Sequence, residues 1–533
     1  MDAPGATFAA RELPCQLAKG SGARHCARDA RRQLTYDASN HQYMPHHSLI
    51  ATTRKERRQL GRKCRDKVSR LSQGDWNPKQ REFDALQLLR QSQRGRVTRL
   101  LPIKYARMAA SPFGYFRGSV PVMAADLARL PRTDMLVQIC GDAHVRNLGA
   151  FTGADGRLIF DINDFDETIR GPWEWDVKRM AASLVLAGRE AKNNERDCKD
   201  AVLAFARRYR EAMAEFAKMP AIDLARYQVF RQVHVSPVVS VLSKAERATP
   251  MHNLEKLTAY SHGNHHFRDQ KPLQQHVSQD LANQVIDSLR NYQTTLLPER
   301  RHFFAQYRAV DVSFRVVGTG SVGVRDYIVL MFAGAIDDPL FMQIKEEIPS
   351  AYAPYLPHTR IPMHEGQRVV EGGRAMQVQS DVFLGWTSIE GRDFLVRQLR
   401  DHKASIEDDD LEGAGLVQYA RVCGELLSKG HARSGDPCAL YGYLGSSDKF
   451  DKAMVKFGVA YADQAEKDHQ ELVRAVRSGL LPAIALEDTE LKFTPPSSRN
   501  SKTAKSKAAK KKDDAAEEKG KAKSVSGNSS KAT

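Results

Sequence analysis

The chain has 533 residues, of which 41% are hydrophobic and 27% charged, and its formal net charge at pH 7 is +17. This length exceeds the size at which a single hydrophobic core stops growing, so two or more compact parts are expected. No apolar run approaches eighteen residues and the start lacks a charged-then-apolar signal, so we expect neither a membrane-spanning helix nor secretion.

The positive charge is concentrated in the two flanks of the chain. Residues 1–75 contain fifteen Lys and Arg against seven Asp and Glu, and residues 501–533 contain ten Lys against four acidic residues. The 425 residues between them therefore carry only +3. This distribution predicts either weak polyanion contact through the flanks or simply higher solubility, and no folded nucleic-acid-binding face. No membrane partner is expected.

Seven cysteines stand far apart in the sequence, with no CxxC pair among them. The odd number and the wide spacing argue against a disulfide framework and against a cysteine zinc site. Cys140 lies in the apolar run MLVQIC and is expected in the core. A reducing, cytoplasmic location is therefore predicted.

Both flanks are predicted to be disordered. Residues 1–75 mix Gly, Ser, Arg and His without a sustained period, apart from a basic helix near 53–71. Residues 491–533 form a low-complexity tail of Lys, Ala and Ser. The sequence between these flanks is patterned and contains no evident repeat.

The first patterned part, residues 76–305, is predicted to be mainly helical. Short buried strands are expected at 136–140 and 157–162, separated by a loop and an ADG turn. A helix is expected to begin at Asp176, because apolar residues follow it at helical spacing. Several helix-like segments fill the rest of this part.

Residues 306–410 are predicted to be a small β-rich part. The runs VSFRVVG, DYIVLMFAG and PLFMQIK are strand-like and are joined by glycine turns, and residues 381–399 are typical of a hairpin. Residues 411–490 then complete the helical part, with an apolar helix near 416–430. The predicted fold class is therefore α+β.

An acidic constellation follows the first predicted strand. Asp142 and Asn147 stand in ICGDAHVRNLGAF, and Asp164 follows Asp142 by 22 residues. Phosphoryl transfer from ATP needs a carboxylate that accepts the acceptor's proton, and an amide and a second carboxylate that hold Mg²⁺. These three side chains supply the required oxygens. Asp166 and Asp161 are further candidate metal ligands, ranked below Asp164.

The motif GD-x-H-x-x-N, followed by D-x-[DE] at a strand end and then by W-D, resembles the catalytic segment of the aminoglycoside-phosphotransferase and choline-kinase branch of kinase-like folds. The resemblance implies that Asp142 is the catalytic base and that Asn147 and Asp164 are magnesium ligands. It also implies that Asp176 braces the catalytic loop from its helix. The alternative for Asp176 is an ordinary helix N-cap.

The chain departs from this pattern at Cys140, where the kinase-like motif has a histidine before GD. His144 stands where the pattern also has a histidine, and it is expected to support the loop. The segments SPFGYFRG, GDAHVRNLG and NDFDETIRGPWEWD also resemble an uncharacterised bacterial family of unknown function. That resemblance covers about residues 76–470 and implies no established activity.

A glycine-rich loop separates two of the predicted strands. Gly318, Gly320 and Gly323 are followed by the apolar run DYIVLM, so the pattern is strand, loop, strand, which is the kinase form of a phosphate-covering loop. Lys345 ends an apolar strand 22 residues after Gly323, like the lysine of V-A-I-K, and would hold the α- and β-phosphates of ATP. A plain β-turn and an exposed strand end are the alternatives.

Glu371 is the candidate partner of Lys345, with Glu365 as a second choice and a solvated helix face as the alternative. In ordinary kinases the glycine loop and the lysine precede the catalytic Asp, whereas here they follow it. The sequence therefore predicts a two-lobed, protein-kinase-like fold that is circularly permuted, which is acceptable because chain ends commonly lie close together.

Other functions remain open at this stage. Residues 164–168, DFDET, have the DxDxT form of haloacid-dehalogenase-like phosphatases, in which the first Asp is the nucleophile. A pseudokinase that binds ATP without transfer is another alternative. The acceptor, whether a small alcohol or a protein, is not predicted, and neither is the choice between phosphoryl and nucleotidyl transfer.

Two further segments stand out without an assigned role. SPFGYFRG offers Arg117 near an aromatic cluster, and KGHARSGD offers His431, Arg433 and Asp436. Either segment could line the cleft and contact phosphate, although loop packing is the expected role.

Overall fold

The structure is a computed structural model, and it describes residues 53–228, 235–247, 249–334, 338–359, 361–399 and 404–489. The predicted disorder of residues 1–52 and of the tail from 491 onward lies outside these residues. The basic helix expected near 53–71 is confirmed as α3 (Arg54–Lys67). In the part of the chain that is described, none of the helices has the length and apolar character needed to cross a membrane.

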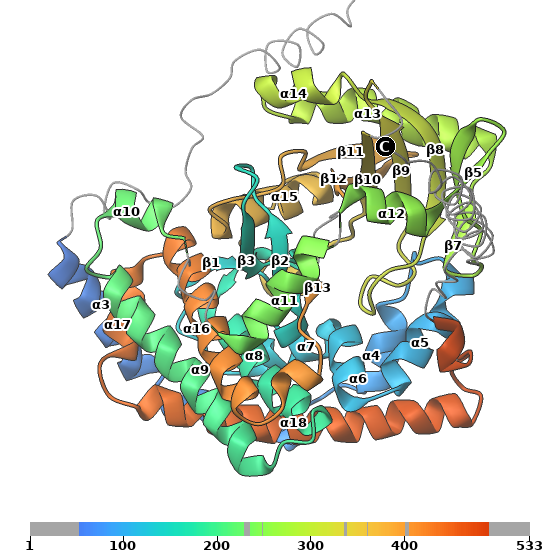
Figure 1. Cartoon of the computed structure of the whole chain (residues 1–533). Helices are drawn as coiled ribbons and strands as arrows, with labels where there is room; N and C mark the ends of the chain where they lie inside the picture. Colours follow the sequence, from blue (N-terminus) through green and yellow to red (C-terminus); the bar gives the residue numbers. More distant parts are fainter. Residues whose placement is uncertain are drawn as a thin grey trace, which may run out of the picture. The chain divides into compact units, whose positions relative to one another are not determined.

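The patterned region is a mixture of helices and antiparallel strands, as predicted (Figure 1). The helices before β8 are α4 (Ala85–Gln91), α5 (Leu101–Ala109), α6 (Pro112–Gly118), α7 (Val120–Arg129), α8 (Trp173–Glu190), α9 (Glu195–Phe216), α10 (Ala221–Arg226), α11 (Ser236–Arg247), α12 (Pro250–Leu257), α13 (Gln279–Thr295) and α14 (Pro298–Phe304). The later helices are α15 (Glu365–Met376), α16 (Ala414–Ser434), α17 (Pro437–Leu444) and α18 (Lys449–Arg477).

The strands form one large and several small sheets. The first strands are β1 (Leu136–Ile139), β2 (Leu148–Thr152), β3 (Leu158–Ile162), β4 (Ile169–Pro172), β5 (Thr258–Ser261) and β6 (Asn264–Phe267). The later ones are β7 (Gln274–His276), β8 (Arg308–Arg315), β9 (Asp326–Phe332), β10 (Pro339–Glu346), β11 (Gly385–Ile389), β12 (Arg392–Gln398) and β13 (Ala404–Ser405). β1 pairs with β4, β2 lies between β13 and β3, and β5 pairs with β6.

The large sheet has six strands in the order β11-β12-β10-β9-β8-β7. Every neighbouring pair is antiparallel, so β8, β9 and β10 follow one another through turns, as the sequence predicts. The predicted hairpin is confirmed as β11 and β12, and its turn residues Glu390 and Gly391 both have positive φ, which the tight hairpin turn requires. The strand that carries Lys345 is therefore central, with the glycine loop on one side and this hairpin on the other.

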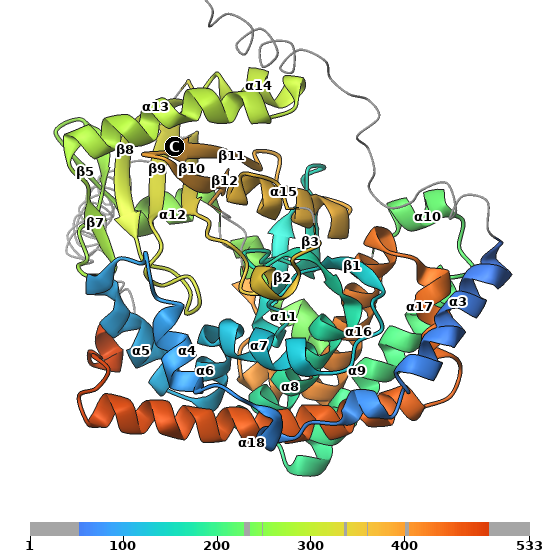
Figure 2. The same cartoon turned by 180° about the vertical axis from the view of Figure 1, so that it is seen from behind.

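The two faces of the large sheet bury different side chains because successive residues of a strand alternate between faces. Val329 of β9 packs in the cluster that contains α13, whereas Ile328 packs against α12. Figures 1 and 2 show α13 along one face and α12 near the other. The predicted boundary at residue 305 differs from this packing, because β7, α13 and α14 share the core of the sheet.

Helix α8 lies in the centre of the helical core. It begins at Trp173, three residues before the predicted start at Asp176, with Pro172 as the preceding residue in extended conformation. Both tryptophans of its first turn are fully buried, and Trp173 stacks on Tyr209 of α9. A helix that is buried on nearly every side must pair its charged residues within the protein. Two of these residues, Asp176 and Arg179, contact the loop after β1, which carries Asp142.

Candidate functional site

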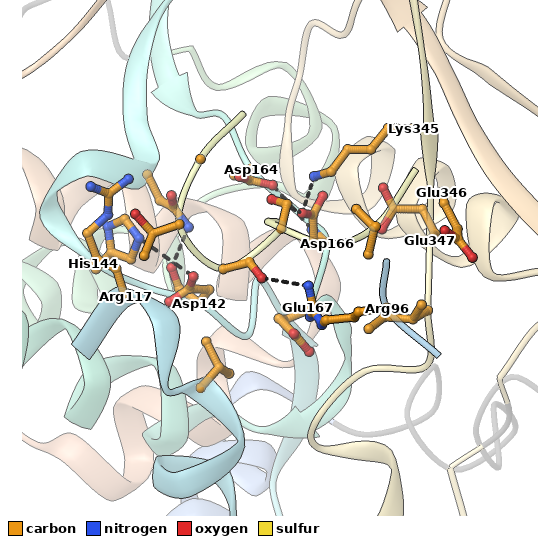
Figure 3. Close-up of a pocket in the computed structure, with 18 residues that line it drawn as sticks. Arg96, Arg117, Asp142, His144, Asp164, Asp166, Glu167, Lys345, Glu346 and Glu347 are labelled. Carbon is orange, nitrogen blue, oxygen red and sulfur yellow. Dashed lines mark hydrogen bonds and ion pairs between the residues drawn. The ribbon is translucent and has the colours of Figure 1, made fainter. Parts of the chain in front are cut away.

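Most of the site residues predicted from the sequence line one cavity (Figure 3). The predicted site residues that line it are Asp142, Asn147, Asp164, Asp166, Gly318, Gly320 and Lys345. Gly323 and Glu371 are not among the lining residues. The cavity also contains Arg96, Arg117, His144, Glu167, Glu346 and Glu347. Segments that lie about 180 residues apart in the sequence therefore share one cavity.

Asp142 occupies the loop after β1 and is held by a buried arginine. Arg179 of α8 donates its Nε proton to Oδ1 of Asp142 at 2.7 Å, and Nε2 of His144 lies 3.6 Å from Oδ2. Burial raises the pKa of Asp142 to about 6, although Arg179 opposes the rise. Burial likewise lowers the pKa of His144 well below its ordinary value, with Arg117 and Arg179 contributing. This corner of the cavity therefore holds a carboxylate poised near neutral pH beside a neutral imidazole.

Asp176 braces the loop that carries Asp142, as the resemblance implies. One carboxylate oxygen of Asp176 accepts the backbone N–H of Cys140 at 2.8 Å and the other accepts that of Gly141 at 3.0 Å. Nε2 of His431, on α16, lies 3.2 Å from the same carboxylate. The N-cap interpretation of Asp176 is wrong, because the residue lies inside the first turn of α8. Cys140 is buried, as predicted. It stands where the kinase-like motif has a histidine, and in this structure the histidine that contacts Asp176 is His431 of α16.

Asn147 is oriented by the same loop. Its Nδ2 donates to the carbonyl oxygen of Asp142 at 2.6 Å, and its side chain is almost fully buried at the cavity wall. With the amide nitrogen engaged, the amide oxygen is the atom that suits a cation. Asn147 precedes β2, and β2 pairs with β3, which leads to Asp164. This strand pair places the amide and the carboxylate at the same cavity.

Lys345 forms an ion pair with Asp166 across 179 residues of sequence. Its side chain is only 3% exposed. Although burial lowers the pKa of Lys345, the neighbouring carboxylates of Asp166, Glu347 and Asp164 raise it above its ordinary value. The ammonium is therefore charged. It faces the loop between β3 and β4, residues 163–168, which carries Asp164, Asp166 and Glu167 and is called the acidic loop below (Figure 3).

Two buried carboxylate oxygens at this end of the cavity have no hydrogen-bond partner among the described residues: Oδ1 of Asp166 and Oε1 of Glu347. Glu347 is 6% exposed, and burial, together with Asp166, raises its pKa well above the ordinary value. Unsatisfied buried oxygens of this kind suit a hard divalent cation. Within the described ranges, however, no group of three or more His, Cys, Asp or Glu could hold a metal ion. A cation here would therefore need an amide, water or phosphate oxygens as further ligands.

The glycine loop is held by cations from the segment before α6. Arg107 donates to the carbonyl of Gly318, while Arg96 (2.9 Å) and Lys104 (2.8 Å) both donate to that of Gly320. In a trans peptide the C=O and the N–H point in opposite directions. Because the carbonyl of Gly320 points toward Lys104, the backbone N–H of Ser321 in the same peptide points away from Lys104. The side-chain hydroxyl of Ser321 donates a hydrogen bond to Asp166 at 3.3 Å.

The glycines serve two structural needs. Gly318 and Gly323 have φ of +68° and +98°, which disfavour residues with a Cβ. A Cβ at Gly320 would lie 3.3 Å from the backbone oxygen of Arg117, so the loop packs closely on the end of α6. Gly323 shapes the loop from outside the cavity, against the side chain of Arg96. The strand–loop–strand pattern predicted from the sequence is confirmed.

The predicted pairing of Lys345 with α15 is wrong. Glu371 is exposed and accepts a hydrogen bond from Gln367 at 2.7 Å, and Glu365 pairs with Arg368 within the helix. The helix is held to the acidic loop by Arg368 instead, whose guanidinium donates to the carbonyls of Asp166 (2.9 Å) and Thr168 (2.7 Å). Glu371 lies on the exposed face of α15, whereas Arg368 is buried and its guanidinium faces the loop.

Asp161, a metal candidate ranked with Asp166 below Asp164, does not line the cavity. It is a buried residue of β3 and pairs with Lys429 of α16, which is also fully buried. We expect Lys429→Met to lower the free energy of unfolding by about 3–5 kcal/mol, because it leaves a buried carboxylate uncompensated. Chemical denaturation checks this value. The double variant Lys429→Met with Asp161→Asn should recover most of the loss, and a single variant as stable as the wild type would contradict the pairing.

The remaining residues of interest have structural roles, with one exception. Nδ1 of His431 lies 2.8 Å from the hydroxyl of Tyr209, Arg433 donates to the carbonyls of Ala225 and Gln377, and Asp436 caps α17. These contacts confirm loop packing for that segment. The exception is Arg117, which lines the cavity.

Sequence reasoning missed four residues that the structure brings to the site, namely Arg179, Glu347, Arg96 and Lys104. Arg179 lies in the apolar run of α8, where a buried charge requires a partner, and this signal was readable. Glu347 follows Lys345 by two residues, so strand alternation predicts that both side chains lie on one face. Arg96 and Lys104 carried no such signal, because nothing local links them to a loop more than 200 residues away.

A family described as "Uncharacterized protein conserved in bacteria (DUF2252)" matches residues 96–475, close to the extent of 76–470 expected from the motifs. No curated protein and no solved structure matches the chain.

The five cysteines in the described part of the chain are free. Cys15 and Cys26 lie outside that part.

Proposed function

We propose, from the premise that this chain belongs to the family "Uncharacterized protein conserved in bacteria (DUF2252)", that it is an ATP- and Mg²⁺-dependent, kinase-like phosphotransferase acting on a hydroxyl acceptor. The observation that carries the proposal is the single cavity in which Asp142, Asn147 and Asp164 share a wall with the glycine loop and Lys345. Phosphoryl transfer depends mainly on positioning and on charge stabilisation, and this cavity supplies both kinds of group.

Each residue has a role in this proposal. The loop at Gly318 and Gly320 covers the phosphates with its backbone N–H groups, and Lys345 holds the α- and β-phosphates. Asp142 receives the proton of the acceptor hydroxyl and orients its oxygen for attack on the γ-phosphorus; the bond from that phosphorus to the β–γ bridging oxygen then breaks, and ADP leaves. Arg179 keeps Asp142 in place.

The residues present fit a magnesium ion. Asn147 and Asp164 offer one oxygen each at the cavity wall, and Asp166 contributes a buried oxygen without a hydrogen-bond partner in the described part of the chain. Mg²⁺ commonly takes one or two carboxylates together with substrate phosphates and water, which agrees with the small number of protein ligands here. When bound, the ion would neutralise charge that develops on the phosphates.

Glu347 replaces Glu371 as the proposed partner of the lysine. Lys345 is paired with Asp166, and Glu347 lies close enough to influence the pKa of Lys345. If Asp166 turns to the metal, Glu347 remains as the carboxylate that holds the ammonium in position. The lysine would then come from β10 and its glutamate from the residue directly after this strand, and α15 would support the loop at residues 163–168 through Arg368.

The arrangement along the chain supports a circularly permuted, two-lobed kinase-like fold. The acidic loop comes first, the six-stranded sheet with the glycine loop follows, and α16 to α18 return to the helical core. The separate cores around α8 and around the sheet correspond to the two lobes of this proposal.

Calorimetric titration with ATP, with and without Mg²⁺, tests the proposal. We expect binding by the wild type that strengthens with Mg²⁺, and a loss of affinity of about 10-fold or more in Lys345→Met, since a charge-assisted contact contributes about 1.5–3 kcal/mol. Arg325→Met is the control. It removes a cation that pairs with Glu346 at the end of β10, but Arg392 still pairs with Glu346, so this variant should bind ATP normally.

Product analysis separates the alternatives. Release of ADP supports the phosphotransferase, release of pyrophosphate would indicate nucleotidyl transfer, and ATP binding without either product would indicate a pseudokinase. Phosphate release from p-nitrophenyl phosphate without ATP would favour the DxDxT phosphatase instead.

A further inference from the structure

Arg117 is the residue of the segment SPFGYFRG that lines the cavity, and the proposed function assigns it no role. It lies in the last turn of α6, which Ser111 caps, and it lines the cavity. Its Nε atom is buried and has no hydrogen-bond partner among the described residues. A buried charged group without a partner is costly unless a ligand satisfies it.

The other arginines near this corner are already engaged. Arg179 binds Asp142, Arg96 binds the carbonyls of the glycine loop, and Nη2 of Arg146 lies 2.5 Å from a carboxylate oxygen of Asp408. Burial, together with the neighbouring charge of Arg146, lowers the pKa of Arg117, which means that its surroundings do not fully compensate its charge. The Nε atoms of Arg96 and Arg146 also lack a hydrogen-bond partner, but other nitrogens of these two guanidinium groups are engaged. Among the described residues, Arg117 makes no side-chain hydrogen bond or ion pair, so its whole guanidinium is available to an anion.

The position of Arg117 indicates which anion it meets. Figure 3 shows Arg117 and His144 beside Asp142 at one end of the cavity, and Lys345 with Glu347 at the other end. Asp164 and Asp166 lie between the two ends. A triphosphate held by Lys345 and by a metal at Asp164 approaches Asp142 from the Lys345 end. The space beside Arg117 then belongs to the acceptor.

We propose that Arg117 binds an anionic group on the acceptor, so that the substrate is a hydroxyl compound that carries a phosphate or carboxylate near the hydroxyl. This inference rests on the proposed function, because it takes the opposite end of the cavity as the nucleotide site. A planar guanidinium binds either anion through paired N–H donors. The γ-phosphate of ATP is the competing source of the same chemistry.

Inorganic phosphate is the probe, titrated calorimetrically into protein saturated with Mg²⁺ and the β,γ-imido analogue of ATP, which fills the γ position. We expect the wild type to bind phosphate and Arg117→Gln to bind it at least ~10-fold more weakly, in line with the strength of a charge-assisted hydrogen bond. The analogue itself should bind both proteins equally. Arg146→Gln removes the same charge from the neighbouring residue, which pairs with Asp408, and should leave phosphate binding unchanged.

Two results would overturn the inference. Equal phosphate binding by wild type and Arg117→Gln would exclude Arg117 as the anion site. Weaker binding of the imido analogue by Arg117→Gln, with ADP binding unchanged, would assign Arg117 to the γ-phosphate. Failure of the wild type to bind the analogue at all would count against the proposed function, and phosphate titration of the protein alone would then still decide whether Arg117 binds an anion.

Discussion

Asp164→Ala is expected to weaken Mg²⁺-dependent ATP binding by at least about 100-fold and to abolish turnover. The metal contributes several kcal/mol of charge stabilisation at the phosphates, and Asp164 is the carboxylate that the proposal assigns to it. ATP binding measured without Mg²⁺ should change little, because Lys345 and the glycine loop remain. Calorimetric titration at a series of Mg²⁺ concentrations checks both statements.

Asp155→Ala is the matched control for this variant. Asp155 lies in the turn between β2 and β3, where it contacts Arg157 through that residue's backbone N–H at 3.1 Å and its guanidinium at 3.9 Å, and it does not line the cavity. It should bind Mg²⁺ and ATP like the wild type. If Asp164→Ala folds normally and retains full Mg²⁺ dependence, the assignment of Asp164 as a metal ligand is wrong.

Asp142→Asn is expected to lower kcat by about 10²- to 10⁴-fold while ATP binding is retained, because the amide cannot accept the acceptor's proton. ADP release from Mg–ATP with water as acceptor provides the measurement before the natural acceptor is identified. Since the substitution also removes the partner of the buried Arg179, thermal unfolding of the variant must be measured beside its activity.

The pH profile of the wild type tests the same role without a mutation. A general base must be ionised, and burial raises the pKa of Asp142 to about 6. The value of kcat/KM should therefore fall about tenfold per pH unit below 6 and level off above it, since this quantity reports the pKa of the free enzyme. A profile that is flat between pH 5 and 8, or a variant with full activity, would remove Asp142 from the mechanism.

The parts of the fold that repeat a local pattern were predictable from the sequence. Alternating and apolar runs predicted β8, β9, β10 and the hairpin of β11 and β12, and helical spacing predicted α16. The start of α8 was misplaced because Asp176 suits an N-cap, whereas burial of both tryptophans extends the helix to Trp173. Helix α13 packs on the large sheet and shares its hydrophobic core, although the sequence placed this helix in the preceding helical part. This packing is a tertiary contact, and the periodicity of a segment does not show which other segment it will contact.

The site shows the same division between local and tertiary information. Asp142, Asn147 and Asp164 were predictable because each stands at a fixed distance from a strand or a helix start. The choice of Glu371 as partner of Lys345 failed, since helical phase decides which side chain of α15 faces inward and Arg368 takes that position. Glu347 was readable from strand alternation.

The central claim is that one cavity holds the nucleotide and the metal between Lys345 and Asp142. A crystal structure with Mn²⁺ and the β,γ-imido analogue of ATP tests it most directly, because manganese can be located by its anomalous signal. We expect a manganese peak within coordination distance of Asp164 and Asn147, with the triphosphate beside Lys345. Nucleotide bound outside this cavity, or a manganese ion held by other residues, would contradict it.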